Sequence, residues 1–271
     1  MRQQLVAALF VALSTPALAA SEVWDSIRQE LYGEQFLLDG KGIIAIDAPY
    51  RTPEDARANL SAHIVAPRNT EISEVTVVLD ENPMPVSAVF RFENPLPRFF
   101  FDVTMRVNGP TPMHVVARTS DGRLFVSETF VKTTGQGACS APPGTDPEVA
   151  LKSLGEMQIE LAGRLTVGAG GTLDPLNPGA WLNELQLDLD HPQHSGMQMD
   201  QITLLFTPMR YVENLDVELD GAGYVEMTGS ISLSENPTVS LSVPSEAQSV
   251  DVTMTDTSGT VSEAHKDLTG Y

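Results

Sequence analysis

The feature that most constrains the fold is an alternation of apolar and polar residues at a period of two, which begins near Gly42 and fills most of the chain. Such alternation places every second side chain on the same face of a β-strand, so each run predicts a strand with one buried face. The clearest runs are Leu60-Ala62-Ile64, Val86-Ala88-Phe90-Phe92, Phe99-Phe101-Val103-Met105-Val107, Leu185-Leu187-Leu189, Leu215-Val217-Leu219, Val239-Leu241-Val243 and Val250-Val252-Met254. Asp121-Gly122 and Asp220-Gly221 are typical hairpin turns. Short strands joined by such turns predict antiparallel β-sandwiches.

The β-patterned regions form two halves, separated by a stretch rich in Gly, Ala, Ser and Pro. We therefore expect an all-β fold of two immunoglobulin-like β-sandwich domains, joined by a flexible stretch and a short helix. The first domain, preceded by a short helix that ends at Gly33, is placed at residues 20–138, and the second at 180–271. In the connecting segment 139–179, Asp146, Pro147 and Gly155 delimit a helix of about two turns, and a long loop follows. Both halves contain Glu-Asn-Pro, at 81–83 and 235–237, which is too short to establish a duplication.

Residues 1–19 have the pattern of a secretory signal peptide. Arg2 supplies a positive charge, residues 5–13 are mostly apolar, and Ala17-Leu18-Ala19 is a small-x-small cleavage signal. About nine apolar residues are too few to span a bilayer, which requires roughly 20. The expected location is the periplasm, reached after cleavage behind Ala19, with no insertion into the membrane.

The composition restricts the classes of partner. The formal net charge is −20 at pH 7, from 36 acidic and 16 basic residues, and removal of Arg2 makes it more negative. A chain so acidic is repelled by nucleic acid and by anionic membrane surfaces. A hydrophobic content of 42% is ample for a packed core.

The single cysteine, Cys139, lies in the run "TTGQGACSAPPG" from Thr133 to Gly144. An exported protein with one cysteine has no internal disulfide partner for it, so the thiol stays free, pairs with another molecule or carries a group. A free cysteine is most often a small buried hydrophobe. Here the Gly-, Ser- and Pro-rich neighbours predict a solvent-exposed thiol that waits for a partner enzyme.

A second candidate site is "HPQHSGMQM", which offers His191, His194, Met197 and Met199. Imidazole and thioether groups suit copper, although an ordinary loop with core methionines has the same composition. We expect no required copper and no other metal. Catalytic residues are not indicated either, because the sequence has no nucleophile motif such as G-x-S-x-G, and Gly168–Gly171 is not followed by a helix that could cradle a phosphate. The sequence therefore predicts a protein that is not an enzyme and has no cofactor.

Four segments carry a family resemblance: "VTVVLDENPMPVSAVFRF" (Val75–Phe92), "HVVARTSDGRLFVSETFVKTTGQGAC" (His114–Cys139), "HPQHSGMQMDQ" (His191–Gln201) and "SLSENPTVSLSV" (Ser232–Val243). On these segments the first half resembles SoxY and the second resembles SoxZ, the two subunits of the sulfur carrier of the sulfur-oxidation (Sox) system. The single-chain arrangement is similar to the SoxYZ-like carriers associated with quinoprotein (PQQ) dehydrogenases. This resemblance implies a periplasmic sulfur or thiol carrier with Cys139 as its covalent attachment point.

Two departures from the SoxY pattern affect the expected reach of the thiol. In SoxY the cysteine lies in a terminal Gly-Gly-Cys-Gly-Gly arm, whereas this chain reads Gly137-Ala138-Cys139-Ser140-Ala141. The segment is also followed by a second domain, and a loop tethered at both ends reaches less than half as far as a free tail of equal length.

Three functional hypotheses remain at this stage. The first is the covalent carrier, with partners in a quinoprotein dehydrogenase or cytochrome c pathway. The second is an acidic periplasmic docking module that recruits a basic partner, such as a cytochrome, without covalent chemistry. The third is a copper-binding β-sandwich protein that uses His191, His194 and the two methionines.

Overall fold

The computed structural model describes residues 22–135, 137–142, 144–145, 147–165, 182–200 and 203–268. The expected signal peptide with its cleavage site, the cap Asp146 and the glycines 168–171 lie outside the described residues. Among the described residues, no helix combines the length and the apolarity needed to cross a bilayer.

The described chain is mostly β-strand. The first half contains α1 (Glu22–Tyr32), β1 (Leu37–Asp39), β2 (Ile44–Asp47), β3 (Ala58–Val65), β4 (Ile72–Leu79), β5 (Val86–Leu96), β6 (Arg98–Met105), β7 (Thr111–Thr119) and β8 (Leu124–Val131). The connecting segment contains the one-turn 3-10 helix η1 (Ala138–Ser140) and the helix α2 (Pro147–Ala150). The second half contains β9 (Met157–Arg164), β10 (Leu182–Leu189), β11 (Val212–Leu219), β12 (Ala222–Thr228), β13 (Thr238–Pro244), β14 (Ser249–Asp256) and β15 (Val261–Asp267).

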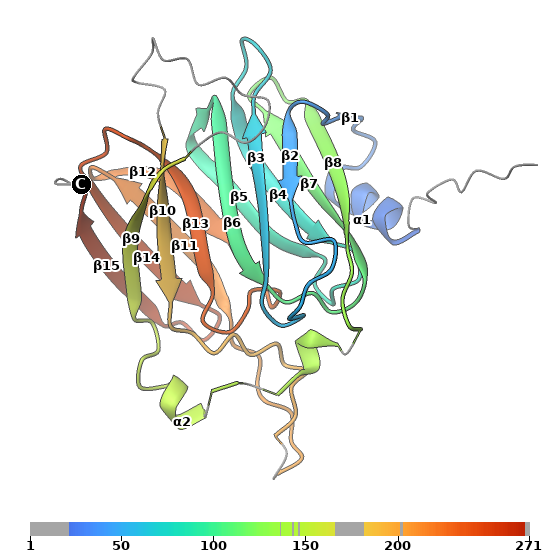
Figure 1. The fold of residues 1–271 in the computed structure, drawn as a ribbon, viewed down its shortest axis with the longest axis vertical. Coiled ribbons are helices and arrows are strands. Elements are labelled where there is room, and N and C mark those ends of the chain that lie inside the picture. Colours follow the sequence, from blue (N-terminus) through green and yellow to red (C-terminus); the bar gives the residue numbers. More distant parts are fainter. Residues whose placement is uncertain are drawn as a thin grey trace, which may run out of the picture.

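These strands form two sheets that pack face to face, as the alternating pattern predicts (Figure 1). The larger sheet has the order β1-β8-β7-β4-β5-β12-β11-β14-β15, and the smaller has the order β2-β3-β6-β13-β10-β9. Their strand pairs are antiparallel except for β1 with β8. The predicted all-β sandwich fold is therefore confirmed.

Each sheet continues from the first half into the second, which the sequence did not predict. In the larger sheet β5 pairs with β12, with Phe90 opposite Met227. In the smaller sheet β6 pairs with β13, with Phe101 opposite Leu241. These two strand pairs form the seam between the halves, and one hydrophobic core runs through both of them.

The predicted strand faces agree with the observed burial. Alternate residues of β3, β5 and β6 lie in the core, including Leu60, Phe90 and Phe101, all of which are fully buried. The ring of Phe90 contacts those of Phe99 and Phe101 at centroid distances of 5.3 and 5.0 Å. The turns at Gly122 and Gly221 have φ values of 83° and 77°, which glycine adopts without strain, as expected for hairpin turns.

The two helices differ in how well the sequence predicted them. Helix α1 ends at Tyr32, directly before Gly33, as expected, and buries Trp24, whose indole stacks on the His114 ring at 3.8 Å. Helix α2 spans only four residues, so the expectation of two helical turns up to Gly155 was wrong. Gly155 instead donates its N–H to the carbonyl of Asp190, which draws the chain into the second half before another helical turn forms.

Candidate functional site

Cys139 lies in η1, at the end of the sandwich where the loops of both halves meet (Figure 1). Its side chain is 0% exposed, so the expectation of a solvent-exposed thiol was wrong. The reason is that the Gly- and Pro-rich run does not project into solvent. Its backbone is not paired in a regular strand or helix, and it forms hydrogen bonds to side chains from distant parts of the sequence instead. We call the described residues of 134–145 the thiol segment.

Two polar side chains clamp the backbone of Cys139. Its N–H donates to Asn108 Oδ1 at 3.2 Å, and its carbonyl accepts a hydrogen bond from the Ser195 hydroxyl. Asn108 comes from the loop between β6 and β7 in the first half, whereas Ser195 comes from the loop between β10 and β11 in the second. Asn108 is itself positioned by its N–H, which donates to Asn82 Oδ1 at 2.9 Å. The thiol is thus held at the junction by one residue from each half.

The ends of the thiol segment are held by carboxylates. At one end, the Thr134 N–H lies 3.0 and 2.9 Å from the two Asp55 oxygens, and the Thr134 hydroxyl donates to the same carboxylate. At the other end, Glu235 accepts the N–H groups of Gly144 and Thr145 at 2.7 and 2.8 Å. Hydrogen bonds to an ionised group are stronger than those between neutral groups. The segment is therefore fixed at both ends, again by one residue from each half.

A buried arginine lies near the thiol. Arg106 is 3% exposed, and its Nη1 donates to the carbonyls of Gln193 at 2.7 Å and Leu233 at 2.8 Å. These carbonyls belong to the second half, so Arg106 ties the end of β6 to that half. Burial lowers the pKa of Arg106, while the nearby Cys139 and Glu235 act in the opposite direction.

The surroundings keep the thiol protonated. Burial raises the pKa of Cys139 to about 11, and the charge of Arg106 only partly offsets this. Only the thiolate is a good nucleophile. In the observed conformation Cys139 is therefore both inaccessible and unreactive.

Two open cavities flank the thiol segment. One of about 410 Å³ is lined by Arg57, Arg106 and Glu235, and another of about 470 Å³ is lined by Glu54 and Asp55. Ala138 and Ala141, on either side of Cys139 in sequence, line both cavities. The turn that carries the thiol therefore adjoins both cavities.

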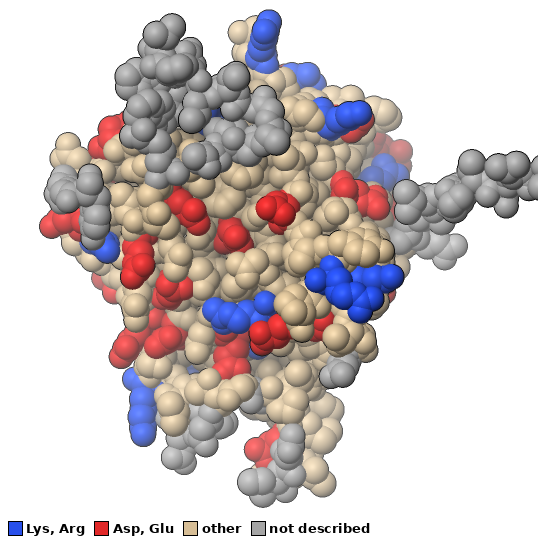
Figure 2. Space-filling model, in the orientation of Figure 1, with Lys and Arg blue, Asp and Glu red and all other residues tan. Residues whose placement is uncertain are grey.

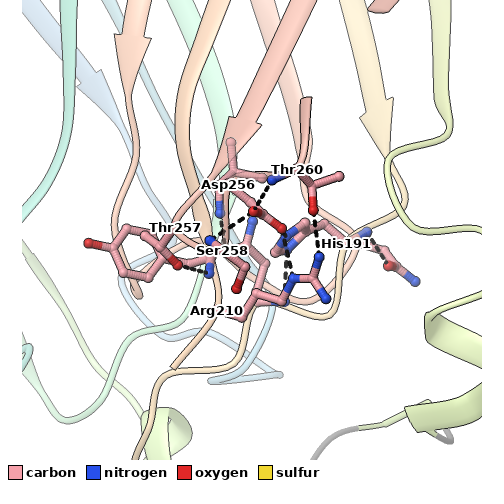
Figure 3. A network of polar contacts seen from close by, with 10 residues as sticks. His191, Arg210, Asp256, Thr257, Ser258 and Thr260 are labelled. Carbon is pink, nitrogen blue, oxygen red and sulfur yellow. Dashed lines mark hydrogen bonds and ion pairs between the residues drawn. The ribbon is translucent and has the colours of Figure 1, made fainter. Parts of the chain in front are cut away.

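His191, a ligand in the copper hypothesis, has a structural role. It is 1% exposed, its Nδ1 accepts the Gln193 N–H at 3.1 Å, and its Nε2 lies 3.3 Å from Asp256 Oδ2 (Figure 3). With both ring nitrogens engaged, His191 has no lone pair free for a metal. The described residues contain no group of three or more His, Cys, Asp or Glu side chains placed to hold a metal ion.

Asp256 organises the network around His191. It accepts Arg210 Nε at 2.7 Å and the N–H groups of Ser258 and Thr260 at 2.9 and 2.8 Å (Figure 3). Burial pushes the pKa of Asp256 upward, but the hydrogen bonds from Arg210, Thr260, His191 and Ser258 outweigh it and hold the pKa at about 2. The network fixes the base of the loop that carries Ser195.

Of the site residues, the sequence singled out only Cys139. The clamping residues Asn108 and Ser195, the anchors Asp55 and Glu235, and the buried Arg106 were not identified. The repeated Glu-Asn-Pro was the available signal: Asn82 positions Asn108, Glu235 holds the thiol segment, and Asn236 Oδ1 accepts the His191 N–H at 3.0 Å. The copies of this motif at 81–83 and 235–237 thus support the loops that meet at the thiol, whereas a third copy at 93–95 lies in β5.

Fold and site together define a two-part β-sandwich protein with one thiol held between its parts. Residues 28–139 match the family model of the sulfur oxidation protein SoxY, and residues 179–267 match that of the sulphur oxidation protein SoxZ. The chain is therefore a fusion of a SoxY domain and a SoxZ domain, and the SoxY match ends at Cys139.

Comparison with solved structures gives two examples of likeness. The sulfur carrier protein SoxY from Chlorobium limicola f thiosulfatophilum is 21% identical, with a TM-score of 0.34, over 43% of this chain and 99% of that one. A structure of a 1.5-MDa bacterial ice-binding adhesin, described in connection with host cell surface retention, is 8% identical, with a TM-score of 0.22. The match covers 82% of this chain and 61% of that one. No curated protein sequence matches the chain.

Proposed function

We propose that this protein is a periplasmic sulfur carrier, not an enzyme, that holds its cargo covalently on Cys139. The observation that carries the proposal is that the SoxY match ends on the chain's only cysteine, and that this cysteine lies where the SoxY and SoxZ domains meet. The N-terminal sequence pattern supports the periplasmic location. The single-chain arrangement, similar to that of carriers associated with quinoprotein dehydrogenases, supports work beside such a pathway.

The proposed carrier has a closed and an open form. In the closed form the sulfur is buried and protonated, so a stray disulfide or oxidant in the periplasm cannot reach it. At Cys139 itself this form is held by two hydrogen bonds between neutral groups, from Asn108 and Ser195. They can be exchanged for water at modest net cost, because a typical hydrogen bond contributes only about 1 kcal/mol to stability, while Asp55 and Glu235 keep the ends of the segment in place. The open form exposes the thiol to a partner enzyme.

Loading requires only exchange between sulfur atoms. Cys139 Sγ loses its proton and attacks a sulfur atom of a donor that contains a sulfur–sulfur bond. A new bond forms between Sγ and that sulfur, while the donor's bond breaks and its other sulfur leaves with the electron pair and takes up the proton. The step exchanges one sulfur–sulfur bond for another, so it needs no added oxidant or reductant. The reverse reaction releases the cargo from Cys139.

The test is mass spectrometry of the protein isolated from its native periplasm without reductant. We expect an added mass that maps to Cys139 and disappears on treatment with dithiothreitol, and a Cys139→Ser variant that carries no such mass and does not support the pathway. Full pathway activity with Cys139→Ser, together with an unmodified wild-type thiol, would instead support the acidic docking module. Figure 2 shows the acidic side chains spread over the sandwich on which that alternative rests.

A further inference from the structure

A hairpin-like projection lies beside the thiol segment. We call the described residues of 194–210 the finger. In Figure 1 the finger extends below the sandwich, next to the green turn η1. Its two arms are joined by backbone hydrogen bonds between His194 and Arg210, at 2.7 and 2.9 Å, and from the Thr207 N–H to the Gln198 carbonyl at 2.8 Å. Further out, Met199 and Phe206 form an antiparallel bridge.

The finger presents an unusual amount of apolar surface. Its exposed large hydrophobic side chains, between 38% and 69% exposed, are Met197, Met199, Leu204, Leu205, Phe206 and Met209. Six such side chains present on the order of 500 Å² of apolar surface, a size at which a patch on a monomer is often functional. Asp200 is the only charged residue between 195 and 209 in a chain of net charge −20.

The base of the finger is built to hold it in this position. Arg210 ends the finger and is bound by Asp256 through Nε at 2.7 Å and by Thr260 through Nη2 at 2.6 Å (Figure 3). Gly196 has a φ of 79°, and a Cβ there would lie 3.1 Å from the Met209 Cβ, so glycine permits the close approach of the arms. These contacts hold the apolar side chains out in water rather than against the body.

The finger is also connected directly to the thiol segment. Ser195, near its base, donates a hydrogen bond to the Cys139 carbonyl, and Gln198 lines the 410 Å³ cavity together with Ala138 and Ala141. A protein that covers the finger therefore also faces the thiol segment.

We infer that the finger is the docking surface for the enzyme that reacts with Cys139, through an apolar groove rimmed by basic side chains. The area argues against a second copy, because two fingers packed together would bury about 1,000 Å² in total, below the roughly 1,200 Å² typical of stable interfaces. A partner that covers both the finger and the neighbouring thiol segment buries more surface than the finger alone offers, and can reach the area of a stable interface. The basic rim follows from charge, since the chain has a net charge of −20, and the exposed Asp200 and Glu54 lie in the finger and in the cavity lined by Gln198. Like charges would repel a second acidic chain.

This inference rests on the carrier function proposed above, and the experiment separates the two. In the native host, a photo-crosslinking amino acid is placed at Leu205, and at Phe36 as a control. Phe36 is 80% exposed and lies near the opposite end of the sandwich, where the neighbouring Gln35 accepts a hydrogen bond from Arg118. In parallel, proteins bound to Cys139 as mixed disulfides are trapped with acid and identified.

We expect the same protein to be captured from Leu205 and from Cys139, and not from Phe36. Phe206→Asp should lower the yield of both captures at least tenfold, whereas the matched Phe36→Asp should leave both unchanged. Both variants should retain the wild-type unfolding midpoint, because the two rings lie mostly in solvent. Raising the salt concentration should lower the yield at Leu205, because it screens attraction to a basic rim.

Other outcomes overturn the inference in distinguishable ways. Three results would show that the finger does not bind the partner enzyme, while still agreeing with the carrier function. They are capture at Cys139 without capture at Leu205, capture of different proteins at the two positions, and crosslinking of the protein to itself at Leu205. Unchanged capture at Cys139 in Phe206→Asp has the same meaning. If no protein is captured at Cys139 and no adduct is found there, both the carrier function and this inference are wrong.

Discussion

At the scale of single residues, the chemistry of Cys139 depends on whether η1 stays in place. The sulfur has no contact with solvent, and burial raises the pKa of the thiol to about 11. An ordinary cysteine has a pKa near 8.5, so about a quarter of it is thiolate at pH 8, against about one part in a thousand for Cys139. The reactivity of the native thiol thus reports directly on opening of the thiol segment.

We predict that Cys139 in the folded protein reacts with iodoacetamide at pH 8 at least about 100-fold more slowly than in denaturant, because both its thiolate fraction and its accessibility are low. The native rate should rise about tenfold per pH unit up to about pH 11, where the thiol titrates. Stopped-time labelling followed by mass spectrometry measures both rates.

Ser195→Ala tests the origin of this protection. It removes the hydrogen bond to the Cys139 carbonyl but leaves the charges around the sulfur unchanged, so native labelling should become several-fold faster. A matched change at a half-buried serine whose hydroxyl bonds Glu246 and not the thiol segment, Ser245→Ala, should have no effect. Rapid native labelling of the wild type, independent of denaturant, would contradict the buried position of the thiol.

At the scale of elements, the loops at this end of the sandwich carry the function and the strands position them. The loop from β10 to β11 is held by His191, Arg210 and Asp256 (Figure 3). Burial lowers the pKa of His191 to about 4, although the hydrogen bond and the charge of Asp256 act to raise it. This network should make the loop sensitive to acid.

We predict that the free energy of unfolding falls by roughly 3 kcal/mol between pH 6.5 and pH 4 through His191 alone. The sign follows from the pKa, which is about 6.5 in the unfolded chain and about 4 in the folded one. Between these values the unfolded chain binds a proton that the folded chain does not, so this contribution is complete above pH 6.5 and is lost as the pH falls to 4. Urea unfolding across this range measures the loss.

The control for this prediction is His191→Gln, which cannot titrate. Its stability is expected to be lower at neutral pH but to change much less between pH 6.5 and pH 4. Protonation of Asp256, whose pKa is held at about 2, adds a further loss only below about pH 4. An equal fall in wild type and His191→Gln would show that other groups cause the acid sensitivity.

The elements also show which properties could be read from the sequence. The buried faces of β3, β5 and β6 were predictable because Leu60, Phe90 and Phe101 each follow from alternation within a few residues. The burial of Cys139 was not predictable in this way. It depends on Asn108 and Ser195, which lie 31 and 56 residues away along the chain. The composition of the thiol segment therefore pointed to exposure, whereas tertiary contacts decided the outcome.

At the scale of the whole molecule, the two domains share both sheets. The seam pairs β5 with β12 and β6 with β13, and the buried Phe90, Phe101, Met227 and Leu241 lie on it. Backbone pairing between strands leaves no mark on the alternation of either strand, so the sequence predicted two sandwiches but not their continuous sheets. A continuous core also explains how residues from both domains can hold one thiol.

We predict that residues 20–145 and 157–271, produced as separate chains in one cell, assemble into a stable one-to-one complex with the near-ultraviolet circular dichroism spectrum of the intact protein. Each chain alone should aggregate, because it exposes two unpaired strand edges and the buried side chains beside them. Size-exclusion chromatography with light scattering distinguishes these states. Phe101→Asp in the first chain should prevent assembly, since it places a charge in the shared core, whereas the exposed Phe36→Asp should not. If each half is instead a folded monomer alone, the domains fold independently, and pairing across the seam is not required for either of them to fold.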